Sequence, residues 1–181
     1  MKVKLVNQYI IPFAGLNEGN HEFSFTFDKK FFDEFIVLEI REGFVTADVQ
    51  LEKKSSMLAL EIKMSGKIQI QCDRCLDYFF FPIEFRGDLL VKFGSDTSSG
   101  TDEIWILDPN EHELDLKQYF FECLGLCIPI QRVHPENPDG SSQCNRDMIG
   151  ILKTHYKKEQ HKQETDPRWD KLKDLLNDNN N

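Results

Sequence analysis

Two cysteines three positions apart, Cys72 and Cys75, are the residues whose type and spacing point most directly to chemistry. Two thiolates on one tight turn can share a tetrahedral zinc ion, as in a zinc knuckle. A C-x-x-C pair can also lower the pKa of a thiol and cycle through a disulfide. A metal site would need a second pair of ligands, and three cysteines and five histidines remain as candidates.

The C-x-x-C stands between two stretches of alternating hydrophobicity. Apolar side chains occupy even positions from Leu58 to Ile70 and odd positions from Phe79 to Phe93. Period-two alternation is typical of strands with one buried face. The sequence therefore predicts strands over 57–71 and 78–93 that form a hairpin with the two cysteines at its tip.

One candidate for the second ligand pair is Cys123 with Cys127. They are four residues apart in a predicted helix, so they share one face, and that spacing can bind a metal. We prefer to interpret both as small buried apolar residues, because free cysteine is commonly buried.

The other candidate pair is His134 with Cys144. These residues bracket a stretch rich in Pro, Asn, Asp, Gly and Ser without apolar periodicity, so burial in a core explains them poorly. With the C-x-x-C they would form a Cys3His set, a common structural zinc composition. The competing interpretation is that the C-x-x-C residues belong to a simple turn and that His134 is a solvated loop histidine. We expect the other histidines to be surface residues, namely His21, His112, His155 and His161.

Strands and one central helix make up the rest of the prediction. Asp115 with Gln118 resembles a capping box that opens an amphipathic helix over 115–128. Asp28 is suited to cap a short helix that carries three Phe. Further extended segments are expected over 3–13, 21–27, 37–51 (a strand pair, or one strand bent at Gly43) and 104–107.

The C-terminal part predicts a basic linker over 153–165 and a last short helix that starts at Asp166-Pro167. We expect one α+β domain over 1–152, followed by linker, helix and tail over 153–181. The fold would be a mostly antiparallel sheet that can curve towards a barrel, packed against the central helix, with the last helix at its edge.

Composition narrows the class of protein. The chain has 181 residues and a net charge of −9, so whole-chain electrostatics would repel nucleic acid, and RNA contact would need a local basic patch. We expect about four in five of the Phe in the core. The sequence has neither a bilayer-length apolar stretch nor a secretory start, which predicts a cytoplasmic protein with reduced or metal-bound cysteines.

These motifs together resemble the bacterial YceD-like family, described as large ribosomal RNA subunit accumulation proteins. The resemblance rests on the C-x-x-C-Leu and the Phe-rich strand after it, on the helix that ends in Leu-Cys-Ile-Pro, and on the Val-His and later Cys. It extends to the terminal Asp-Pro-Arg-Trp and covers about residues 30–176. The position that matches His134 is often cysteine in that family, which favours His134 and Cys144 over the helical pair.

The resemblance implies a non-enzymatic accessory protein with a structural zinc at Cys72, Cys75, His134 and Cys144. Its partner would be precursor ribosomal RNA or a ribosomal protein, and an acidic body would suit a basic protein. RNA contact would use local basic residues, namely Arg74, Arg132, Arg146, Lys157 and Lys158. The lysines among them also fit a solvated linker.

Two other function classes stay open. One is a thiol-disulfide oxidoreductase that uses the C-x-x-C, although redox pairs usually follow a strand and open a helix, whereas here a strand follows a strand. The other is a zinc-free protein-interaction domain. The sequence contains no phosphate-binding Gly loop, nucleophile elbow or H-E-x-x-H motif that would indicate catalysis.

Overall fold

The computed structural model of the chain describes residues 4–5, 9–35, 39–94 and 104–160, and side chains within 9–35, 39–94 and 104–156. The chain divides into two compact units, Met1–His134 and Pro135–Asn181. The predicted domain boundary between residues 152 and 153 stays a prediction.

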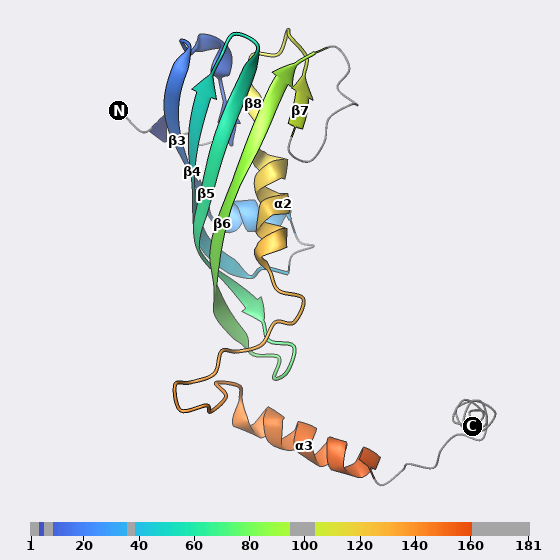
Figure 1. Cartoon of the computed structure of the whole chain (residues 1–181). Helices are drawn as coiled ribbons and strands as arrows, with labels where there is room; N and C mark the ends of the chain where they lie inside the picture. Colours follow the sequence, from blue (N-terminus) through green and yellow to red (C-terminus); the bar gives the residue numbers. More distant parts are fainter. Residues whose placement is uncertain (1–3, 6–8, 36–38, 95–103, 161–181) are drawn as a thin grey trace, which may run out of the picture. The chain divides into compact units, whose positions relative to one another are not determined.

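Long alternating strands build the first unit (Figure 1). Its main sheet has the order β1-β3-β4-β5-β6-β7; β3 to β6 are antiparallel, and β1 and β7 add parallel edge pairs. The bounds are β1 (Lys4–Leu5), β3 (Gly19–Phe27), β4 (Glu42–Lys53), β5 (Met57–Gln71), β6 (Tyr78–Phe93) and β7 (Ile104–Leu107). A second, antiparallel pair joins β2 (Ile10–Ile11) to β8 (Leu114–Asp115).

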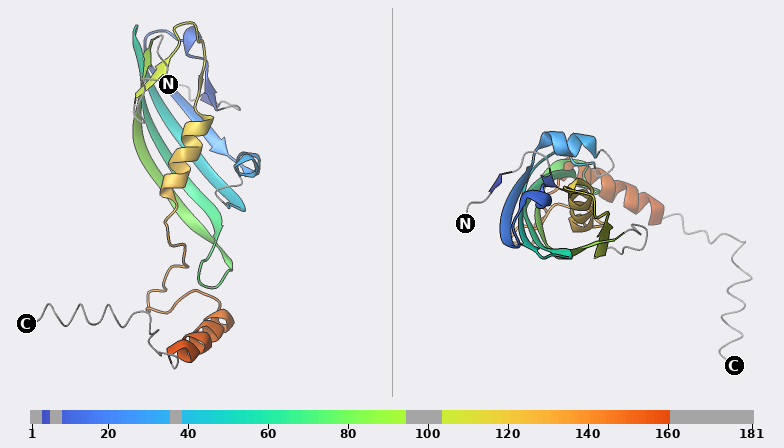
Figure 2. Two further views of the ribbon diagram at one scale, coloured as in Figure 1. Left: turned by 90° about the vertical axis from the view of Figure 1, so that its right-hand side faces the viewer. Right: turned by 90° about the horizontal axis from the view of Figure 1, so that it is seen from above.

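The predicted α+β class with a mostly antiparallel sheet is confirmed. The sheet curves around helix α2 (Lys117–Cys127), as Figure 2 shows. It does not close into a barrel, since the described edge strands β1 and β7 pair only with β3 and β6.

The β5–β6 hairpin follows the predicted alternation. Its register runs from Met57 opposite Lys92 to Gln71 opposite Tyr78, so the strand ends meet at residues 72–77. Even positions of β5 and odd positions of β6 point to one face, which is buried at Leu58, Leu60, Ile62, Met64, Ile68, Ile70, Phe79, Ile83, Leu89 and Val91.

Gly66 allows β4 and β5 to approach closely. A Cβ at this position would lie 2.1 Å from the carbonyl oxygen of Phe44 and 2.7 Å from the Cα of Val45. Backbone atoms cannot yield as a flexible side chain can, so the sheet needs glycine here.

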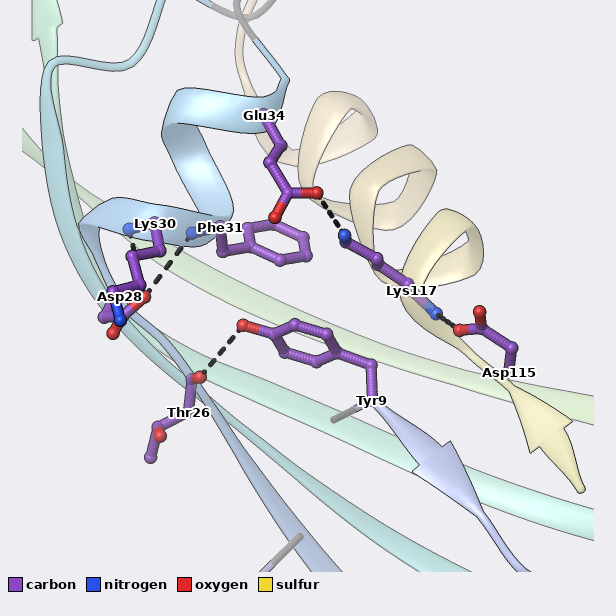
Figure 3. A network of polar contacts seen from close by, with 8 residues as sticks. All are labelled: Tyr9, Thr26, Asp28, Lys30, Phe31, Glu34, Asp115 and Lys117. Carbon is purple, nitrogen blue, oxygen red and sulfur yellow. Dashed lines mark hydrogen bonds and ion pairs between the residues drawn. The ribbon is translucent and has the colours of Figure 1, made fainter. Parts of the chain in front are cut away.

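Helix α2 and the short helix α1 (Lys29–Glu34) close the core with aromatic side chains. The Asp28 carboxylate accepts the amide hydrogen of Lys30 at 3.0 Å and thereby caps α1, as predicted. Figure 3 shows this cap beside Tyr9, whose hydroxyl donates to the Thr26 carbonyl. Burial, with Asp28 and Glu34 nearby, raises the pKa of Tyr9 to about 12, so the half-buried phenol stays neutral.

The capping box predicted for the central helix is wrong. The Asp115 carboxylate accepts from the Lys117 amide at 2.8 Å, but the Gln118 side chain donates forward to Glu122. Side-chain competition explains the difference, because a glutamate one turn ahead offers a charged acceptor.

The other departures concern boundaries and burial. The extended segment predicted over 3–13 is two short strands followed by a 3₁₀ turn (Phe13–Gly15), and β4 is a single strand that begins at Glu42. Eight of the fifteen Phe are buried, five are half-buried and two are exposed, fewer in the core than predicted. The exposed two, Phe44 and Phe80, lie on the outer face because their strand positions have the opposite parity to the core residues.

The second unit contains helix α3 (Arg146–Gln160), which the sequence analysis did not predict. The Asn145 carboxamide oxygen accepts the amide hydrogen of Asp147 at 3.0 Å and so opens the helix. The stretch predicted as a linker is therefore helical up to Gln160, and the last predicted helix lies outside the described residues. None of the helices in the described ranges has both the length and the apolar character needed to cross a bilayer.

Candidate metal centre

The turn between β5 and β6 is closed by its own backbone. The Leu76 amide donates to the Cys72 carbonyl at 2.9 Å, and the Cys72 amide donates to the Asp77 carbonyl at 2.9 Å. Leu76 has a φ of 63°, in the left-handed region that a tight turn requires. These bonds fix Cys72 and Cys75 on one compact turn.

A second segment of the first unit lies against this turn through reciprocal bonds. The Asp73 amide donates to the Arg132 carbonyl at 2.7 Å, and the Arg132 amide donates to the Asp73 carboxylate at 2.7 Å. The Arg132 guanidinium also approaches Asp73 at 3.5 Å and Glu39 at 3.0 Å. Because Arg132 precedes His134 by two residues, this contact positions the imidazole at the turn.

The imidazole of His134 faces the turn. Its Nδ1 lies 3.4 Å from the Sγ of Cys75, and its ring lies 4.6 Å from that of Phe79, centroid to centroid. The donor atoms of Cys72, Cys75, His134 and Cys144 all lie within 4.8 Å of one another. The four residues that the sequence singled out are thus brought together.

The donor set and its spacing fit zinc. Zn–S bonds of about 2.3 Å and Zn–N bonds of about 2.0–2.1 Å at tetrahedral angles place a sulfur and a nitrogen about 3.6 Å apart and two sulfurs about 3.8 Å apart. The 3.4 Å between Cys75 and His134 is close to the first value. This Cys3His group could therefore hold a metal ion with only small adjustments.

Backbone amides prepare Cys72 for that role. Burial by itself would raise the pKa of its thiol, but the amides of Cys75, Arg74 and His134 and the His134 ring donate towards the sulfur. Together they lower the pKa of Cys72 from 9.0 to about 6. A thiolate is the form that a metal binds.

The helical cysteines do not join this group. Burial, the largest influence, raises the pKa of Cys123 to about 11 and also raises the pKa of Cys127. The Cys127 thiol donates to the Cys123 carbonyl at 3.2 Å, one turn back along α2. Cys123 is the buried core residue that we preferred from the sequence, whereas Cys127 is only half-buried.

The remaining histidines lie away from the Cys3His group. His112 and His155 are exposed and His21 is half-buried, with its Nε2 2.8 Å from the Asn17 carbonyl oxygen. His161 lies outside the described residues.

The predicted RNA-contact residues differ in their surroundings. Arg74 is exposed on the turn, and Arg146 is exposed at the first position of α3. Arg132, by contrast, is engaged by Asp73 and Glu39. Lys157 and Lys158 fall in α3, but their side chains lie outside those described.

The Asp73–Arg132–Glu39 contact was missed by the sequence analysis. Arg132 and Glu39 are 93 positions apart, and neither belongs to a motif. Charge alone could not have paired them.

Fold and site together define an α+β protein in which two cysteines of a β-hairpin tip and two later residues form a Cys3His group able to hold a metal. The family described as large ribosomal RNA subunit accumulation protein YceD matches residues 60–176, and the chain belongs to this family. The match begins within β5 and includes every residue of the Cys3His group. Comparison with curated proteins gives no match, and comparison with solved structures gives none either.

Proposed function

We propose that the protein supports the accumulation of large-subunit ribosomal RNA as a non-enzymatic binding protein built around a structural zinc. Family membership implies the ribosomal role. The observation that carries the zinc assignment is the convergence of Cys72, Cys75, His134 and Cys144 within 4.8 Å.

The zinc would have a structural task. Four protein ligands leave no open coordination position for water, so the ion would stabilise a fold rather than activate a substrate. His134 and Cys144 bracket a stretch without apolar periodicity, and coordination at its two ends would hold it in one conformation. That stretch would then present a defined surface.

Burial weighs against the oxidoreductase alternative. Cys72 and Cys75 are 0% and 1% exposed, whereas a thiol that exchanges disulfides with a partner must be reachable. The pair also sits between two strands rather than at a helix N-terminus, which is the usual position of a redox C-x-x-C. The zinc-free interaction domain remains the second candidate, and zinc analysis of the purified protein decides between them.

The partner would be precursor ribosomal RNA or a ribosomal protein, met in the cytoplasm. An acidic chain gains in encounter rate with a basic protein, whereas RNA binding would have to rely on contacts that need little positive charge. Direct RNA contact would use Arg74, Arg146, Lys157 and Lys158, whereas Arg132 has two carboxylates to neutralise it.

Depletion in the host tests the proposal. We expect the ratio of large- to small-subunit ribosomal RNA to fall, and wild-type protein to restore it. A Cys72→Ser/Cys144→Ser variant should fail to restore the ratio, whereas Cys123→Ala, which keeps the four ligands, should succeed. An unchanged ratio on depletion would contradict the proposed function.

A further inference from the structure

Three exposed aromatic rings gather on the outer face of the sheet near the hairpin tip. Phe44 of β4 is 68% exposed, and Tyr78 and Phe80 of β6 are 43% and 45% exposed. Phe44 lies opposite Lys67 of β5, and Phe80 lies opposite Gln69, two residues further along the same strand. The rings therefore share one face and neighbouring rows of the sheet.

Two cations complete this surface, which we call the aromatic patch: Arg41, Phe44, Lys67, Tyr78 and Phe80. The Lys67 ammonium lies 4.9 Å from the centre of the Phe80 ring, and the Arg41 guanidinium lies 4.9 Å from that of Tyr78. Within the described ranges neither cation pairs with a carboxylate. Their charge stays available to a ligand.

The chemistry of the patch matches unpaired bases. Isolated apolar residues on a surface are ordinary, but a cluster of exposed rings marks a binding site. Proteins that bind single-stranded RNA stack bases on aromatic side chains of an exposed sheet face, two or three bases at a time. Tyr78 and Phe80, two residues apart on one strand, are about 6.7 Å apart along it, and Phe44 lies two strands away.

We infer that the aromatic patch binds a short single-stranded segment of RNA by base stacking, with Arg41 and Lys67 beside the phosphates. The inference rests on the proposed function, because it names the partner class of a protein needed for ribosomal RNA accumulation. Stacking also reconciles RNA binding with a net charge of −9, since it needs few phosphate contacts.

Charge confines the RNA to the tip end of the sheet. In the strand rows that carry the rings, Glu42 and Lys67 are the charged side chains among the described residues, with Arg41 just before β4 and Asp77 just before β6. The other end of the sheet has a hollow of about 800 Å³ whose lining includes Glu22, Glu52, Glu61 and Asp88. Phosphates would be repelled there.

Fluorescence anisotropy with a labelled 12-nucleotide unstructured RNA, alone and as a duplex with its complement, tests the inference on the full chain. We expect the single strand to bind more tightly than the duplex. Phe44→Ala/Phe80→Ala should weaken binding by about 5- to 150-fold for each base that loses its ring. Leu126→Ala removes an apolar side chain of α2 that is 82% exposed and lies outside the patch, and it serves as the control, without effect.

Salt dependence separates the rings from the cations. Two phosphate contacts on a single strand give a slope of about −1.4 in log affinity against log salt, and Lys67→Gln should reduce its size by about 0.7. The ring variants should weaken binding without changing the slope. Lys92→Gln, an exposed lysine at the far end of β6, is the control for Lys67.

Two outcomes overturn the inference: no binding of the single strand up to about 100 μM, the weak end of non-specific association, or equal binding by wild type and the Phe44/Phe80 variant. Circular dichroism and melting of each variant exclude misfolding as the cause. If wild type fails to bind while depletion still lowers the ribosomal RNA ratio, the inference fails and the proposed function stands. Binding through the patch without any fall in the ratio shows the reverse.

Discussion

The two cysteine pairs of the first unit, Cys72/Cys75 on the hairpin turn and Cys123/Cys127 on α2, have opposite acid–base character. Cys72 and Cys123 are both almost fully buried, and burial raises the pKa of each. Yet the pKa of Cys72 is lowered to about 6, and that of Cys123 is raised to about 11.

The difference lies in the backbone around each sulfur. The amides of Cys75 and Arg74 in the turn, and of His134 on the segment that lies against it, have no helical partner and donate to Cys72. In α2, the amides are committed to carbonyls one turn earlier, so the Cys123 sulfur meets mainly apolar surroundings. The comparison teaches that the supply of free amides, more than burial, decides whether a cysteine becomes a thiolate.

The largest expected effect is metal loss from the turn. Cys72→Ser should reduce zinc from about one ion per chain to near zero, because a hydroxyl replaces a thiolate ligand. If zinc binds about a thousandfold above its dissociation constant, its loss costs about 4 kcal/mol of stability and roughly 10 °C in melting temperature. Elemental analysis and calorimetry measure both quantities.

His134→Cys is the matched control for that experiment, since it replaces one zinc ligand by another and should retain the ion. Equal zinc content in Cys72→Ser, Cys144→Ser and Cys123→Ser would reject the assignment of the four ligands.

A loss of stability without metal loss is expected at Gly66. Gly66→Ala places a methyl group 2.1 Å from the Phe44 carbonyl oxygen, which forces β4 and β5 apart. We expect about 3 kcal/mol of destabilisation in urea unfolding, at the upper end of overpacking costs, with zinc content unchanged. Zinc release from this variant would mean that the site depends on strand pairing remote from the turn.

Cys123→Ser probes the helical pair with a smaller effect. A hydroxyl buried in place of a thiol among apolar side chains should cost about 1–2 kcal/mol, measured by urea unfolding, and should leave zinc bound. A variant of wild-type stability would show that Cys123 is not packed as described.

The last expected effect is a change in the pH profile of the metal-free protein. The folded-state pKa of Cys72 lies below its ordinary value, so its contribution is present above pH 9 and is lost as pH falls towards 6. The folded-state pKa of Cys123 lies above it, so that contribution is present below pH 9 and is lost as pH rises towards 11. In urea unfolding with a chelator present, Cys72→Ala should reduce the loss of stability below pH 9, and Cys123→Ala should reduce the loss above pH 9. If both variants show the same dependence of stability on pH, the two cysteines do not differ as described.

Patterns of period two carried most of the fold prediction. The alternation on β5 and β6 identified the hairpin and its tip, because the buried face of a strand imposes that spacing directly. The same alternation places Tyr78 and Phe80 on the outer face. The sequence analysis did not use this signal because it expected most Phe in the core. Helix α3 was missed because its lysines were interpreted as a solvated linker and its few apolar residues, Met148, Ile149, Ile151 and Leu152, follow directly on a polar, turn-rich stretch.

The candidate metal centre was predictable only in part. Residue types identified the C-x-x-C. The choice of His134 and Cys144 over Cys123 and Cys127 as the second ligand pair depended on a family resemblance, because the approach of His134 to Cys75 is a property of the tertiary structure. The engagement of Arg132 by Glu39 could not be foreseen either, since an ion pair leaves no trace in local spacing.

The paired main-chain and carboxylate bonds between Asp73 and Arg132 have a consequence for how the protein would acquire its ion. They need no metal to form, so the newly folded chain already holds two sulfurs and an imidazole in register. Metallation would then follow folding as a late capture step, and a zinc-starved cell would accumulate a folded but unfinished protein that is rescued as soon as the metal returns.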